Sequence, residues 1–152
     1  MKPRIYTDTS VLGGCEDDEF REPSRRLREA FQRGELTLVL SELTLRELET
    51  APEGVRTVVR LVPSANIEAL ALSPEAEELA AAYTADGAIG ARMRADALHI
   101  ALATAARVDV LVSWNFKHIV NLKRIHAYNA VNLKRGYPLL EIRTPREVAG
   151  DE

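Results

Sequence analysis

The sequence predicts a single α/β domain in which a central, mostly parallel sheet is flanked by helices. Short strand-like stretches such as RIYT and VDVLVS alternate with apolar stretches of helical period. This alternation is typical of parallel sheets whose strands are connected by helices. The chain has 152 residues, 46% of them hydrophobic, which suits one ordinary core, so we expect a single domain over residues 1–152.

Strand and helix signals follow one another through the chain. The expected strands are residues 4–7, 36–40, 67–72 (a strand or a connector), 108–113 and 139–145. The expected helices are residues 23–33, 42–51, 52–62, 74–84 and 95–106. Residues 145–152 are expected to form a flexible tail. Gly34 ends the first of these helices, and Ser41 and Ser73 are plausible N-caps.

The amino-acid composition says more about where the protein works in the cell than about what it does. A net charge of −3 neither indicates nor excludes a nucleic-acid partner. Cys15 is the only cysteine and cannot form an intramolecular disulfide, so we expect a reducing, cytoplasmic setting. The N-terminus lacks a signal-like apolar core, and the most apolar segment, residues 97–112, is interrupted by charged residues. We therefore expect no membrane association.

Polar residues cluster where strands end. Asp8 follows the first predicted strand, and Ser113 and Asn115 follow the 108–113 strand. Ligands of open α/β sheets bind outside the carboxyl ends of the strands. Asp96, near the start of the 95–106 helix, can fold back to the same edge. Considered alone, Asp8 is better interpreted as a helix N-cap.

A basic segment follows the 108–113 strand. No acidic residue occurs between Asp109 and Glu141, whereas cations, aromatic residues and asparagines accumulate. Such a strip offers charge for phosphates and rings for unstacked bases. The cations proposed to contact RNA are Lys117, His118, Lys123 and Arg124. The alternative is a solvated amphipathic helix whose aromatic residues belong to the core.

Four motifs, in order YTDTS, SELTLRELE, DALHIALA and LVSWNF, resemble those of PIN-domain proteins, in particular VapC-like ribonuclease toxins of type II toxin-antitoxin systems. The resemblance implies a PIN-like three-layer fold and cleavage of RNA with Mg²⁺ or Mn²⁺. It also implies a homodimer and a cognate antitoxin. The positions that match the family's acidic site are Asp8, Glu47 and Asp96. Glu47 is preferred to Glu42 for its small, apolar context, and Glu42 remains open.

Asn115 stands where the family usually carries a fourth aspartate, so the implied catalytic set is Asp8, Glu47, Asp96 and Asn115. An amide oxygen can ligate a hard cation or orient a water, but it carries no negative charge and cannot act as a base. Carboxylates suit this chemistry because a divalent ion stabilises charge on phosphoryl oxygens and activates water. Crowded carboxylates also predict raised pKa values when no cation is bound.

Neighbouring residues are expected to support this set. The hydroxyls proposed to orient the carboxylates are those of Thr7, Thr9, Ser10 and Ser113. His99, a residue of the 95–106 helix, is expected to be packed or hydrogen-bonded and not to be a ligand.

Two other functions compete with the ribonuclease. An aspartyl phosphotransfer hydrolase is disfavoured because residue 10 is Ser, not the second Asp that such enzymes carry. A non-catalytic PIN-like module that binds RNA or protein is motivated by Asn115. Cleavage of RNA that depends on both metal and the three carboxylates separates the alternatives.

Overall fold

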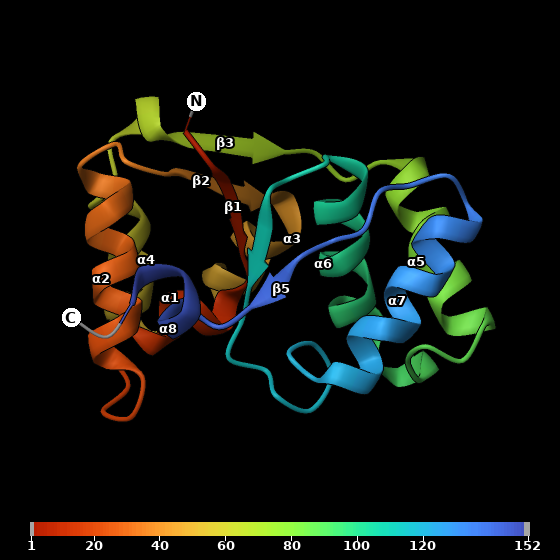
Figure 1. Cartoon of the computed structure of the whole chain (residues 1–152). Helices are drawn as coiled ribbons and strands as arrows, with labels where there is room; N and C mark the ends of the chain where they lie inside the picture. The colour runs from red at the N-terminus through yellow and green to blue at the C-terminus, as the bar shows by residue number, and fades with distance from the viewer. Residues whose placement is uncertain (1, 151–152) are drawn as a thin grey trace.

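The computed structural model describes residues 2–150, and its centre is a five-stranded, all-parallel sheet (Figure 1). The strands are β1 (Arg4–Thr7), β2 (Thr37–Ser41), β3 (Ile67–Leu70), β4 (Val110–Val112) and β5 (Ile142–Arg143). Their order across the sheet is β3-β2-β1-β4-β5, and every pair is parallel. The order reverses between β1 and β4, as in doubly wound folds.

Helices cover both faces of the sheet, which confirms the predicted three-layer α/β fold (Figure 1). The first layer contains α1 (Thr9–Gly14), α2 (Arg21–Gln32), α4 (Glu53–Arg60) and α8 (Pro145–Ala149). The second contains α5 (Pro74–Ala85), α6 (Arg94–Ala105) and α7 (Leu122–Lys134). The remaining elements are α3 (Glu42–Glu49), which leaves β2 directly, and 3-10 turns at Ser64–Asn66 and Ala91–Met93.

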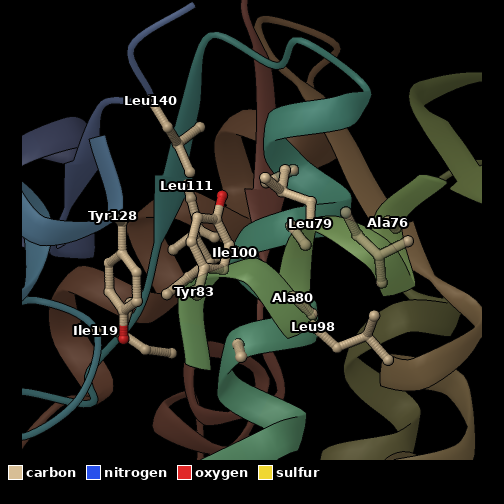
Figure 2. Close-up of a cluster of buried hydrophobic side chains, with 14 of the residues drawn as sticks. Ala76, Leu79, Ala80, Tyr83, Leu98, Ile100, Leu111, Ile119, Tyr128 and Leu140 are labelled. Atoms are coloured by element: carbon tan, nitrogen blue, oxygen red, sulfur yellow. The ribbon is translucent and has the colours of Figure 1, made fainter. Parts of the chain in front are cut away.

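Alternate strand residues feed two separate cores because side chains along a strand point to opposite faces. Ile5, Leu38 and Val112 pack on the α2 side. Tyr6 and Leu111 pack on the α6 side, where side chains of α5, α6 and α7 gather around them (Figure 2). Both faces are therefore dry, which explains why these strands are continuously apolar.

The C-terminal segment differs from its prediction. Residues 145–149 form α8, not a flexible tail, and residues 151–152 lie outside the described part of the chain. Thr144 and Glu147 form a reciprocal capping box, and Arg26 Nη1 donates to the Gly150 carbonyl oxygen at 3.2 Å. Helix α8 packs against α2. Thr144 followed by Pro145, with Glu147 three residues after the Thr, is a sequence pattern that predicts the start of a helix.

Two smaller outcomes concern local structure. The 67–72 stretch, left open between strand and connector, forms the edge strand β3. Ser41 and Ser73 cap α3 and α5 as predicted, because each hydroxyl accepts a backbone N–H from the first turn. Among residues 2–150, no helix has the length and apolar character needed to cross a membrane.

Candidate functional site

The predicted site residues lie at the carboxyl edge of the sheet, where the strand order reverses. Asp8 follows β1, and Ser113 and Asn115 follow the adjacent strand β4. The segments that leave these two strands lead to helices in different layers, α1 and α7 (Figure 1). Helices α3 and α6 bring Glu47 and Asp96 to the same edge, where Glu47 contacts Thr9 and Asp96 contacts Asn115.

Asp8 is held from three sides. Its side chain is 5% exposed, and the hydroxyls of Ser10 and Ser113 donate to its two oxygens at 2.6 Å each. The backbone N–H of Val11 also donates to it at 3.4 Å, so Asp8 is the N-cap of α1 as well. Burial raises the pKa of Asp8, and these hydrogen bonds oppose that rise. Asp8 therefore acts both as the N-cap of α1 and as a member of the candidate site.

Glu47 joins α3 to both neighbouring motifs. Its Oε1 accepts from Thr9 Oγ1 at 2.5 Å and from His99 Nε2 at 2.9 Å. Burial raises the pKa of this carboxyl, but the hydrogen bonds from His99 and Thr9 outweigh burial, and the pKa lies below its ordinary value. The expectation of a raised pKa is wrong for Glu47, because carboxylate-binding donors surround it.

His99 is itself fixed by a buried network. The ring is 2% exposed, and its Nδ1 shares a 2.7 Å hydrogen bond with the Tyr6 hydroxyl. That hydroxyl shares a second bond, at 2.8 Å, with Ser41 Oγ. The prediction of a packed, hydrogen-bonded histidine is confirmed. The network ties Glu47 to both β1 and β2.

Asp96 lies in the first turn of α6 and is half-buried. It is not the helix cap, since the N-cap position is Met93. Asn115 Nδ2 donates to Asp96 Oδ2 at 3.3 Å. Burial raises the pKa of Asp96, and the nearby Glu47 charge adds to that rise, whereas His118, His99 and Asn115 oppose it.

The amide oxygen of Asn115 accepts hydrogen bonds from the backbone of the turn that follows it. That oxygen accepts from the backbone N–H groups of Lys117 at 3.2 Å and His118 at 2.9 Å. The same turn thus fixes the Asn115 side chain and aims its NH₂ group at Asp96. In this arrangement Asn115 orients a carboxylate, and its oxygen is already engaged.

Two predicted neighbours lie elsewhere. Thr7 points to the α2 side of the sheet, because it is one residue out of phase with Asp8, and its hydroxyl lines an apolar pocket that also includes Cys15. It does not support Asp8. Glu42 accepts from the backbone N–H of Leu72 at 2.7 Å, so it faces β3 and not the candidate site.

The donor set suits a hard cation. The three carboxylates offer only oxygen, and within residues 2–150 neither Glu47 Oε2 nor Asp96 Oδ1 has a hydrogen-bond partner. Over the same residues, no group of three or more His, Cys, Asp or Glu side chains is arranged to hold a metal by itself. Mg²⁺ keeps several waters and commonly binds through one or two carboxylates. The oxygen donors therefore match the ligand type of such an ion, and the side chains of residues 2–150 form no closed cage for it.

The basic segment has a mixed structure. Lys117 and Lys123 are exposed, whereas Arg124 Nη1 donates to the Ala88 carbonyl oxygen at 2.9 Å. The buried Nδ1 of His118 has no hydrogen-bond partner within residues 2–150. Tyr128 is fully buried, so it belongs to the core and cannot stack on a base. The amphipathic-helix alternative is right for this ring.

The sequence did not lead us to predict that Tyr6 hydrogen-bonds to His99, or that His99 in turn holds Glu47 in place. Two signals were present. Tyr6 lies two residues before Asp8, which puts both side chains on the α6 face of the sheet. His99 lies three residues after Asp96, close to one helical turn, which puts both on one side of α6.

No protein-family model and no curated protein matches the sequence. Solved structures match its fold. VapC20 of Mycobacterium tuberculosis, described as a Sarcin-Ricin loop cleaving toxin, has a TM-score of 0.58 at 14% identity over 75% of this chain and 92% of that one.

Two further matches cover nearly the whole chain. VapBC2 from Rickettsia felis, bound to a DNA fragment from its promoter, has a TM-score of 0.54 at 16% identity, over 93% of this chain and 98% of that one. FitAcB from Neisseria gonorrhoeae has a TM-score of 0.58 at 13% identity, over 93% and 97%. At these identities the likeness shows a shared fold, that of PIN-domain toxin-antitoxin proteins.

Proposed function

Starting from a fold shared with PIN-domain toxins, we propose that this protein is a metal-dependent endoribonuclease and the toxin of a toxin-antitoxin pair. The observation that carries the proposal is the arrival of Asp8, Glu47 and Asp96 at one edge of the sheet from three distant segments. Among the structural neighbours, VapC20 is described as cleaving the Sarcin-Ricin loop, which supports an RNA substrate.

In this proposal Asp8, Glu47 and Asp96 hold a hydrated Mg²⁺ or Mn²⁺ ion. Such an ion supplies Lewis-acid stabilisation of charge on the phosphoryl oxygens and lowers the pKa of the attacking water. The ligand oxygens free for it include Glu47 Oε2 and Asp96 Oδ1. The raised pKa values of the two aspartates mean that both gain from a nearby cation.

The remaining residues keep the carboxylates in place. Ser10 and Ser113 each donate to Asp8, so its orientation does not depend on the ion. Thr9 and His99 do the same for Glu47. Asn115 orients Asp96 and cannot take a proton from water, so the proposed reaction needs no base at that position.

RNA approaches from the basic side of Asn115. Lys117 and Lys123 are exposed and carry the phosphate contacts in this proposal. Arg124 and His118 are partly buried, so they add positive potential close to the site and fewer direct contacts.

The test uses purified protein, freed of any partner, on structured RNAs with Mg²⁺, Mn²⁺ or EDTA. The variants Asp8→Asn, Glu47→Gln and Asp96→Asn should each lower cleavage at least about 100-fold, equivalent to about 2.7 kcal/mol of transition-state stabilisation. Glu42→Gln is the matched control, because Glu42 lies on α3 like Glu47 but its side chain accepts a hydrogen bond from Leu72, just after β3. It should cleave normally.

Each alternative predicts a different outcome. Metal-independent cleavage that survives all three substitutions would remove the proposed mechanism. RNA binding without cleavage in any metal would favour the non-catalytic module. A covalent phosphoenzyme that requires Asp8 would favour the phosphotransfer hydrolase.

We also propose an antitoxin partner and a homodimer. VapBC2 and FitAcB are toxin-antitoxin proteins of the same fold, which supports the partner. Co-purification of this chain with the product of an adjacent gene, and loss of RNA cleavage in that complex, tests the antitoxin. Light scattering tests the homodimer, and a monomer over a wide concentration range would exclude it.

A further inference from the structure

A hollow of about 370 Å³ adjoins the acidic site. Ser10 and Asn115 belong to both, since Ser10 bonds to Asp8 and Asn115 to Asp96. The volume falls within the range of about 300–1,000 Å³ that is usual for small-molecule sites. Whatever occupies the hollow therefore lies next to the two side chains that bond to Asp8 and Asp96.

Aromatic rings form one wall of this hollow. Phe20 and Trp114 line it and stack on each other, with ring centroids 4.3 Å apart and planes inclined by 17°. The indole is fixed, since Trp114 Nε1 donates to Ser24 Oγ at 2.8 Å. Phe116 is 50% exposed at 6.1 Å from the Trp114 ring. Trp114 is only 7% exposed, so the ring open to a base is the partly exposed ring of Phe20, which Trp114 supports from behind. An accessible ring next to a phosphodiester site suits base stacking, which works with every nucleobase.

A negative charge that lines the hollow disfavours phosphate. Asp17 lines the hollow, is exposed, and has no ion-pair partner within residues 2–150. Its neighbours Glu16 and Asp18 are paired with arginines, whereas one Asp17 oxygen accepts only the Glu19 N–H at 2.8 Å. An unpaired carboxylate repels phosphate oxygens and accepts N–H groups. The acidic loop and the Lys117 side of the site thus present opposite charges.

We propose that this hollow binds one unstacked nucleobase of the RNA, adjacent to the scissile phosphate. The base packs against the Phe20 ring, which Trp114 supports, and turns an edge with N–H donors toward Asp17. Guanine fits best because its N1–H and N2–H groups lie side by side and match the two oxygens of a carboxylate. This inference rests on the proposed ribonuclease function and specifies the substrate as single-stranded at that position.

Gly13 provides a way to fill the hollow without disturbing the fold. It lines the hollow within α1, and a Cβ added there would meet nothing within 4 Å. Leucine and alanine are both better helix formers than glycine. Gly13→Leu therefore occupies the space that the base needs, and Gly13→Ala controls for the change in helix propensity.

Trp114 is the only tryptophan, so its fluorescence reports on the hollow directly. The probe is a single-stranded oligouridylate with or without one central guanosine, titrated in EDTA. We expect saturable quenching, tighter with the guanosine, that Gly13→Ala keeps and Gly13→Leu weakens at least about tenfold, equivalent to about 1.4 kcal/mol. Asp17→Asn should remove the preference for guanosine, and Asp18→Asn should keep it.

The two hypotheses fail in different ways. Absent quenching, or equal quenching with Gly13→Leu, overturns the base site even if the protein cleaves RNA with metal. Quenching that responds to Gly13→Leu and Asp17→Asn supports the base site even if no cleavage is found, because EDTA removes catalysis from the measurement.

Discussion

Replacing Asn115 with Asp tests the contact that organises the fourth position of the site. Asn115 Nδ2 lies 3.3 Å from Asp96 Oδ2 and donates to it. The substitution keeps the acceptor for the N–H groups of Lys117 and His118 but turns the donor into a second carboxylate oxygen. The attractive contact between residue 115 and Asp96 therefore becomes repulsive in the metal-free protein. A bound cation would make the two carboxylates favourable neighbours again.

The magnitude follows from the geometry. Two unit charges about 4 Å apart repel by about 1 kcal/mol in water and about 4 kcal/mol at an effective dielectric constant of about 20. Asp96 is half-buried, so its environment lies between these limits. Adding about 1 kcal/mol for the lost hydrogen bond, we expect Asn115→Asp to lower the free energy of unfolding by about 2–4 kcal/mol in EDTA at pH 8.

The effect should depend on pH with a definite sign. Burial already raises the pKa of Asp96, and a neighbouring charge raises it further. The folded protein then binds protons that the unfolded chain releases, so its stability falls as the pH rises from about 4 through the raised folded value. At about pH 4 and below, the raised pKa values keep the two carboxyls of the folded protein largely protonated, so the repulsion between them is mostly absent and the difference from the parent protein should shrink.

Urea unfolding at pH 4 and pH 8, in EDTA and in Mn²⁺, measures each of these quantities. Calorimetric titration should show at least about tenfold tighter Mn²⁺ binding by Asn115→Asp, since the new carboxylate adds a charged ligand. Asn121→Asp is the matched control, because Asn121 caps α7 and Asp caps equally well. Unchanged stability at pH 8 together with unchanged Mn²⁺ affinity would refute this account of the site.

Three further outcomes are expected. His99→Ala should lower stability by about 1.5–3 kcal/mol through loss of the hydrogen bond to Glu47, and His99→Gln should restore part of it; equal urea midpoints for both variants would contradict this. Burial raises the pKa of Cys15 to about 11, so a thiol reagent at pH 8 should label it only in urea. Thr144→Ala should cost about 0.5–2 kcal/mol locally, seen as faster amide exchange in α8.

The sequence was informative where local patterns decide the structure. Strand β1 and the position of Asp8 follow from a short apolar run that ends in a capping residue. The caps at Ser41 and Ser73 follow from their hydroxyls and the helices behind them. These signals need no knowledge of distant residues, so they could be interpreted from the sequence alone.

Non-local contacts escaped prediction for a physical reason. The pKa of Glu47 falls because His99, 52 residues away, donates to it, and no spacing rule reports that contact. Asn115 donates a hydrogen bond to Asp96 because its amide oxygen already accepts backbone N–H groups of the following turn and because the Asp96 side chain points toward it. Thr7 is different, since strand periodicity alone separates it from Asp8.

The proposed metal ligands are anchored to three neighbouring strands, β2, β1 and β4. Asp8 ends β1, Glu47 reaches β1 and β2 through His99 and Tyr6, and Asp96 reaches the end of β4 through Asn115.

These anchors are hydrogen bonds within the protein itself, so we expect ion binding to order little of the chain and to leave the fold unchanged. We expect Mg²⁺ to slow amide exchange only around these strand ends and the first turns of α1, α3 and α6. Protection that spreads through α5 and α7 would instead mean that the ion organises the site, contrary to the hydrogen-bonded arrangement described above.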